Sequence, residues 1–141
     1  MASNTLKDPQ VYISNEARTL FDSIKKFPDF QKFVNKDFFM FAMLLGYYQK
    51  KKKSLKRSER TESGYARERY FANEDMEFIK AVAVSETGDL RVIESVPAMF
   101  SIAEEYVNGG ISFLRDLIFE NPADFVKKFA GYLRKNLAKQ N

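Results

Sequence analysis

Residues 36–49 read KDFFMFAMLLGYYQ, and apart from one glycine every residue from Phe38 to Tyr48 is apolar or aromatic. Asn35 can cap a helix that begins here, and the charge of Asp37 suits the positive end of the helix dipole. Apolar side chains lie on every side of such a helix, so other parts of the protein must cover all of it. As a helix the apolar run is about 16 Å long, too short for a bilayer core of about 30 Å. The sequence therefore predicts a buried central helix over 36–49.

Two interpretations explain how this helix is covered. The other helices of the chain can enclose it, as in the core of a monomer. A chain of 141 residues has few other helices, so we favour a second copy as the additional cover. The predicted homodimer interface consists of the large side chains of this helix, namely Phe38, Phe39, Phe41, Leu44, Leu45 and Tyr48.

Helical periodicity continues on both sides of this segment. Apolar residues recur at helical spacing over 16–27, and Pro28 ends that helix because proline disfavours αR backbone in the residue before it. An acidic turn opens a helix that ends at Thr87, and an extended link over 90–93 follows it. The predicted helices are 16–27, 36–49, 73–87, one that Ser95 caps, and one that begins at Pro122.

The helix that follows Ser95 contains two adjacent glycines. Apolar residues keep one helical phase from Met99 through Gly109 and Gly110 to Leu117, which favours one long helix. Two glycines in a helix interior cost about 2 kcal/mol relative to alanine. Close approach of another backbone is the best reason for them, and a break into two helices at these glycines is the alternative.

These elements predict a mainly α fold, with about five helices in a compact single domain over 1–141. Alternation of polar and apolar residues over 10–14 allows one short N-terminal β-strand. Residues 10–49 then resemble a stretched ribbon-helix-helix unit, a dimeric DNA-binding arrangement whose paired strands enter a groove. The insertion 28–35 is longer than that motif normally has, which disfavours groove recognition but not dimerisation.

The composition argues against most catalytic chemistry. The chain contains no Cys and no His, which removes thiolate nucleophiles, imidazole bases and Cys/His metal sites. Glu104 and Glu105 diverge by about 100° on a helix and do not pair, so a carboxylate-based metal nuclease is a weak third interpretation. We predict no enzyme, no catalytic residue, no metal and no cofactor. The polar N-terminus lacks the apolar segment of a secretory signal, which predicts a cytoplasmic protein.

Positive charge is concentrated in residues 50–69, here called the basic loop. It carries nine basic and three acidic residues, so the remainder of a chain with net charge +4 is slightly acidic. With almost no apolar periodicity, it is predicted to be mobile. It is either a solvated segment or a contact for an anionic polymer that gains affinity by releasing counterions. The candidate nucleic-acid-binding residues are Lys50, Lys51, Lys52, Lys53, Lys56, Arg57, Arg60, Arg67 and Arg69.

Two stretches carry a resemblance to a known family. One is KDFFMFAMLLGY over 36–47, and the other is IAEEYVNGGISFL over 102–114. Together they resemble the small accessory proteins associated with bacterial DNA phosphorothioation (Dnd) systems. The family pattern has alanine where Val107 stands here, and a shorter basic stretch. The resemblance implies a role beside DNA modification, restriction or phage defence, and it identifies no reaction.

The combined prediction is a non-catalytic, DNA-associated accessory protein that binds nucleic acid nonspecifically through the basic loop. Tyr47 and Tyr48 precede this loop, and Tyr65 lies within it. All three can stack on unpaired bases, although the first two suit the core better. The expected partners are nucleic acid, most simply DNA, a larger modification or restriction enzyme, and a second copy of the chain. The alternative is a helical adaptor whose basic loop docks on an acidic partner surface.

Overall fold

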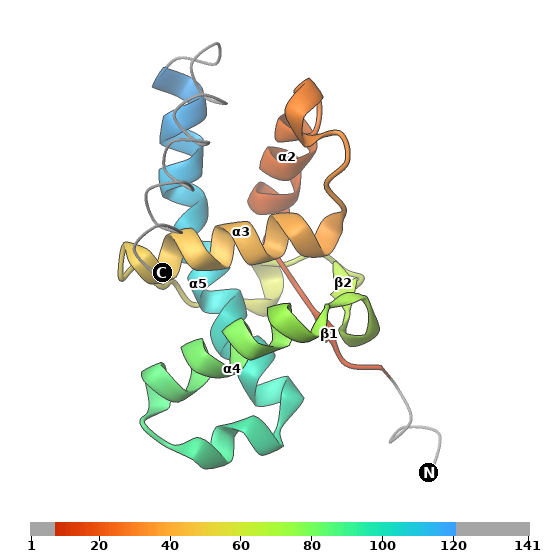
Figure 1. The fold of residues 1–141 in the computed structure, drawn as a ribbon. Coiled ribbons are helices and arrows are strands. Elements are labelled where there is room, and N and C mark those ends of the chain that lie inside the picture. Colours follow the sequence, from red (N-terminus) through yellow and green to blue (C-terminus); the bar gives the residue numbers. More distant parts are fainter. Residues whose placement is uncertain (1–7, 121–141) are drawn as a thin grey trace.

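The computed structural model describes residues 8–120, with side chains over 8–116. This part of the chain contains four α-helices and a two-stranded antiparallel sheet (Figure 1), which confirms the mainly α prediction. The helix predicted to begin at Pro122 lies outside the described residues. The elements in chain order are β1 Gln10–Val11, α2 Asn15–Ile24, α3 Asn35–Tyr48, β2 Ala66–Arg67, α4 Asn73–Thr87 and α5 Val96–Glu120.

Helix α3 is the apolar helix predicted from the sequence, and α5 crosses it (Figure 1). Four of its six proposed interface residues are covered within the single chain, each with 8% or less of its surface exposed: Phe38, Phe39, Phe41 and Leu45. Of the six, Leu44 and Tyr48 alone reach the surface, the second with 38% exposure. One copy therefore covers most of α3, which removes the reason for which the sequence favoured a second copy there.

The crossing of α3 and α5 is built on glycines. A Cβ atom on Gly46 would lie 2.0 Å from the carbonyl oxygen of Tyr106 in α5. A Cβ atom on Gly110 would lie 2.3 Å from the carbonyl oxygen of Ala42 in α3. Only hydrogen fits between backbones at these distances. The prediction of one long helix, with glycines that admit another backbone, is confirmed by α5.

The short sheet joins the N-terminus to the basic loop. β1 pairs antiparallel with β2, so that Gln10 lies opposite Arg67. The strand was predicted, but its partner was not, because the basic loop has no strand pattern. In a ribbon-helix-helix dimer the strand would pair with a second chain, whereas here it pairs within its own chain.

The starts of the helices match the sequence prediction in part. Ser14 caps α2, since its Oγ accepts from the N–H of Ala17 at 3.0 Å. Asn35 was expected to cap α3, but the carboxylate of Asp37 does so instead, accepting from the N–H of Val34 at 2.9 Å. The link over 90–93 was predicted to be extended, and it forms a 3-10 helix over Leu90–Glu94.

Two features are absent from the described residues. Over residues 8–120, none of the helices combines the length and hydrophobicity that crossing a membrane requires. In the same part of the chain, no group of three or more Asp, Glu, Cys or His side chains is placed to hold a metal ion.

Candidate nucleic-acid interface

The lysine run, Lys50–Lys53, begins in a turn that is unusual for lysine. Lys50 has a φ of +54°, in the left-handed region that glycine normally occupies after a helix. Its N–H donates to the carbonyl of Tyr47 at 3.1 Å, and the N–H of Lys51 donates to that of Gly46 at 2.9 Å. This conformation costs an L-residue roughly 1–2 kcal/mol. A lysine thus stands where glycine would be more stable.

The backbone of the lysine run is fixed against α5. A Cβ atom on Gly109 would lie 2.2 Å from the carbonyl oxygen of Lys51, so the run passes directly over this glycine. The N–H of Lys53 donates to the carbonyl of Glu105 at 2.9 Å. The buried Asn108 side chain donates to the carbonyl of Ser54 at 2.9 Å. The backbone of the lysine run therefore completes the α3–α5 crossing, a contact that the sequence did not predict.

The side chains of the lysine run are exposed. Lys52 forms an ion pair with Glu86, which lies in α4. The hydrogen bond between them raises the pKa of Lys52, and this bond together with one from the Tyr106 hydroxyl lowers the pKa of Glu86. The other cations between residues 50 and 57 make no ion pair with any described residue, namely Lys50, Lys51, Lys53, Lys56 and Arg57.

The remaining three predicted cations lie apart from the lysine run, beside the sheet. Arg60 is half-buried and lies over the ring of Tyr12, 4.0 Å from its centroid. Arg69 pairs with Asp8 at 3.3 Å. Arg67 is exposed on β2. The nine predicted residues therefore form two groups, and Arg60 and Arg69 are already occupied by contacts within the protein.

The second half of the basic loop is tied to the N-terminal segment. Backbone N–H groups of Thr61, Tyr65 and Glu68 donate to carbonyls of residues 13, 11 and 9, at 3.0, 2.8 and 2.7 Å. The side chain of Asn35, freed from capping, donates to the carbonyl of Tyr65 at 2.9 Å. Two of these bonds, from Tyr65 and from Glu68, join residues more than fifty positions apart, and composition alone carries no signal for them.

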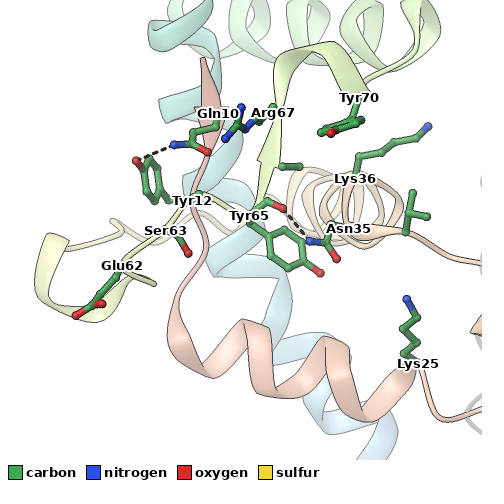
Figure 2. A pocket seen from close by; sticks show the side chains of 13 residues that line it. Gln10, Tyr12, Lys25, Asn35, Lys36, Glu62, Ser63, Tyr65, Arg67 and Tyr70 are labelled. Carbon is green, nitrogen blue, oxygen red and sulfur yellow. Dashed lines mark hydrogen bonds between the residues drawn. The ribbon is translucent and has the colours of Figure 1, made fainter. Parts of the chain in front are cut away.

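A hollow of about 630 Å³ lies beside the sheet, between α2 and the start of α3. Figure 2 shows side chains from all of these elements around it. Its lining contains both cations and tyrosines, which include Lys25, Lys36, Arg67, Tyr12, Tyr65 and Tyr70. Of these, sequence reasoning had selected Arg67 as a cation and Tyr65 as an aromatic. The others come from segments that the sequence did not place together.

Glu104 is a further residue whose surroundings sequence reasoning missed. Its Oε2 accepts a hydrogen bond from the backbone N–H of Tyr12 at 2.7 Å, which joins α5 to the N-terminal segment. Burial raises the pKa of Glu104 to about 7, against the opposing effects of that hydrogen bond and of Arg60. Glu104 titrates near neutral pH as a result.

The described chain is thus a small helical protein with a basic surface segment held on a close helix crossing. Comparison with known families matches residues 10–141 to the family described as DNA sulphur modification system-associated protein 4. The chain belongs to this family, which confirms the resemblance to accessory proteins of Dnd phosphorothioation systems. Searches of curated proteins and of solved structures found no significant match.

Proposed function

We propose that this protein is a non-catalytic accessory protein of DNA sulphur modification that binds DNA nonspecifically. The contacts to phosphate are made by Lys50–Lys53, Lys56 and Arg57. The observation that carries this proposal is that the lysine run combines a fixed backbone with exposed cations. Lys50 further supports the proposal. Its left-handed backbone makes it less stable there than glycine would be, yet this position carries a positive charge.

Fixing the backbone strengthens a phosphate contact in a definite way. Cations on a mobile segment lose chain entropy when they bind, whereas cations on an ordered segment lose mainly side-chain freedom. Each phosphate that is neutralised also releases counterions, and this release favours binding to any DNA sequence. The lysine run thus suits a protein that stays close to DNA while a partner enzyme of the same system modifies or cleaves it.

The lack of catalysis has compositional support. A chain without Cys and His must rely on carboxylates, hydroxyls or lysines. The described carboxylates gather in no metal-binding cluster. We therefore assign the chemistry of the system to its partners.

A charge-matched pair of variants tests the proposal. One variant carries serine in place of Lys50, Lys51, Lys52 and Lys53. The control carries serine at four other cations that lie outside both candidate sites, Lys26, Lys32, Lys80 and Arg91. Both lose the same net charge, so a difference between them reports position rather than total charge.

The measurement is duplex DNA affinity by fluorescence anisotropy over a range of salt concentrations. We expect the lysine-run variant to lower the log–log salt slope by about 3 to 4, since it loses four phosphate contacts that remove roughly 0.9 each. Folded stability should change by less than about 1 kcal/mol, because the substituted side chains are exposed. Equal slopes in the two variants would refute DNA binding through this segment.

A second candidate function, docking on a partner protein, is favoured by a different surface. An apolar hollow of about 190 Å³ lies between α3 and α4, where Tyr48 and Phe78 are 38% and 39% exposed. A partner with an acidic surface could contact this hollow and the basic loop together. Protein docking of this kind depends less steeply on salt than phosphate binding does. Homodimerisation also stays a prediction, and light scattering measures it directly.

A further inference from the structure

Unpaired positive charge lines the hollow beside the sheet. Lys25 at the end of α2 and Arg67 on β2 are both exposed, and neither makes an ion pair with any described residue. A third cation, Lys36, is already held by Asp75 at 2.6 Å. Glu62 is the one carboxylate among the lining residues. The balance of charge in this hollow favours an anionic ligand.

Aromatic rings line the same hollow. Tyr70 is 61% exposed, and Arg69 lies over its ring at 5.4 Å from the centroid. Tyr65 is half-buried, packs on Phe21 of α2 and forms part of the wall of the hollow. Figure 2 shows Tyr70 and Lys25 at opposite rims, with Tyr65 between them. An exposed aromatic ring near unpaired cations is the combination that binds a base together with its phosphate.

We propose that this hollow binds one unpaired nucleotide, with the base stacked on Tyr70 and the phosphate held by Lys25 and Arg67. The volume of about 630 Å³ suits such a ligand, because small-molecule sites typically measure about 300–1,000 Å³. A base in an intact duplex is stacked on its neighbours and has no free face. The ligand is therefore a nucleotide of a single strand, or a free nucleotide of the same chemistry.

This inference deepens the proposed function and rests on it for the choice of nucleic acid as the ligand. Its residues are separate from the lysine run, so the two can fail independently. The lysine run serves duplex DNA through phosphates alone, whereas the hollow needs an exposed base. A protein with both sites can distinguish opened DNA from closed DNA.

The test measures binding of a short labelled oligothymidylate, with thymidine monophosphate as competitor. Tyr70→Ala removes the stacking surface, and Tyr70→Phe keeps it. A double variant, Lys25→Ser with Arg67→Ser, removes the phosphate contacts. Its charge-matched control is Lys26→Ser with Lys32→Ser, which changes two exposed lysines outside the hollow. All these side chains are exposed, so the variants should fold.

We expect Tyr70→Ala to weaken binding by between about fivefold and a hundredfold, and Tyr70→Phe to bind like the wild type. The double variant should lower the salt slope for the single strand by about 0.7, since the one phosphate that Lys25 and Arg67 hold contributes roughly that much. The control should keep the wild-type slope. If Tyr70→Ala binds as tightly as Tyr70→Phe, or the double variant matches its control, the proposal is wrong.

The competitor identifies the source of the nucleotide. Displacement of the oligonucleotide by thymidine monophosphate, lost in Tyr70→Ala, assigns a free nucleotide to the hollow. Retention of the oligonucleotide at high competitor concentration, with the same dependence on Tyr70, assigns a single strand. The lysine-run variant separates this result from the proposed function. Suppose that the lysine-run variant binds duplex DNA like the wild type, while Tyr70→Ala no longer binds the single strand. The proposed function is then refuted, and the nucleotide site in the hollow is supported.

Discussion

Replacing Gly110 with alanine tests the helix crossing on which the lysine run rests. The added Cβ would lie 2.3 Å from the carbonyl oxygen of Ala42 and 2.8 Å from the backbone nitrogen of Gly46. Both atoms belong to the backbone of α3, so no side-chain rotation can relieve the contact. The helices must therefore move apart by roughly 1 Å to restore van der Waals distances.

The energy of this movement follows from packing. A gap of about 0.5–1 Å forfeits a quarter to a half of the dispersion energy between facing atoms. Overpacking in a core costs typically about 1–3 kcal/mol, and a clash between two backbones belongs at the upper end. Alanine also favours the helix by about 1 kcal/mol relative to glycine. We expect a net loss of about 2 kcal/mol in the free energy of unfolding.

Urea denaturation followed by circular dichroism measures this loss. With a slope of about 1–3 kcal/mol per molar urea, the midpoint should fall by about 1 M. Ser101→Ala is the matched control, since Ser101 is exposed on the same helix and its substitution should change stability by less than about 0.5 kcal/mol. A Gly110→Ala protein as stable as this control would show that the backbones of α3 and α5 do not meet at the glycines.

Two further predictions concern Glu104 and Lys50. Because the pKa of Glu104 is raised in the folded state to about 7, its contribution to stability is complete below its unfolded pKa of 4.5 and is lost as the pH rises through 7. Between pH 5 and pH 8 the wild type should therefore lose about 2–3 kcal/mol relative to Glu104→Gln, and parallel pH–stability curves from urea titrations would contradict the burial of this carboxylate. Lys50→Gly should raise stability by up to about 1 kcal/mol, since glycine adopts a φ of +54° without strain, and lower the duplex salt slope by about 0.9. Loss of stability in Lys50→Gly would show that the lysine side chain, rather than the turn, holds the segment in place.

The helices could be predicted because their signals are local. The apolar run of α3 and the single apolar phase through Gly109 and Gly110 both act within a few turns of backbone. Even the reason for the glycines followed, because an unfavourable residue in a strong helix implies a close neighbour. The identity of that neighbour, α3, did not follow from the spacing.

For the candidate site, the sequence predicted only which residues carry the charge, and not where they lie in the fold. The density of charge identified the lysine run. The hydrogen bonds that fix its backbone, however, involve Asn108 and Glu105, which lie more than fifty residues away in the sequence. The residues that pair between β1 and β2 are equally far apart in the sequence. Strands of two residues also leave almost no alternation of polar and apolar residues to detect. The hollow beside the sheet depends on that pairing. Its lining residues could not be brought together from the sequence alone.

How far one chain covers α3 could not be predicted, for a related reason. The sequence shows how much apolar surface the helix carries, but not that a helix crossing on glycines covers it so closely. Gly46 and Gly110 let the backbones of α3 and α5 approach, so that one copy buries Phe39, Met43 and Leu45 almost completely. Small residues at a crossing therefore change the number of helices that a core needs.

The salt dependence of wild-type binding to an unmodified DNA duplex tests the central claim most directly. The lysine run with Lys56 and Arg57 should neutralise about four to six phosphates, so the binding constant should fall with a log–log slope of roughly −4 to −5. The slope should be the same for duplexes of unrelated sequence, because phosphates carry the contact. A slope near zero, or no measurable binding at low salt, would contradict DNA binding through this segment.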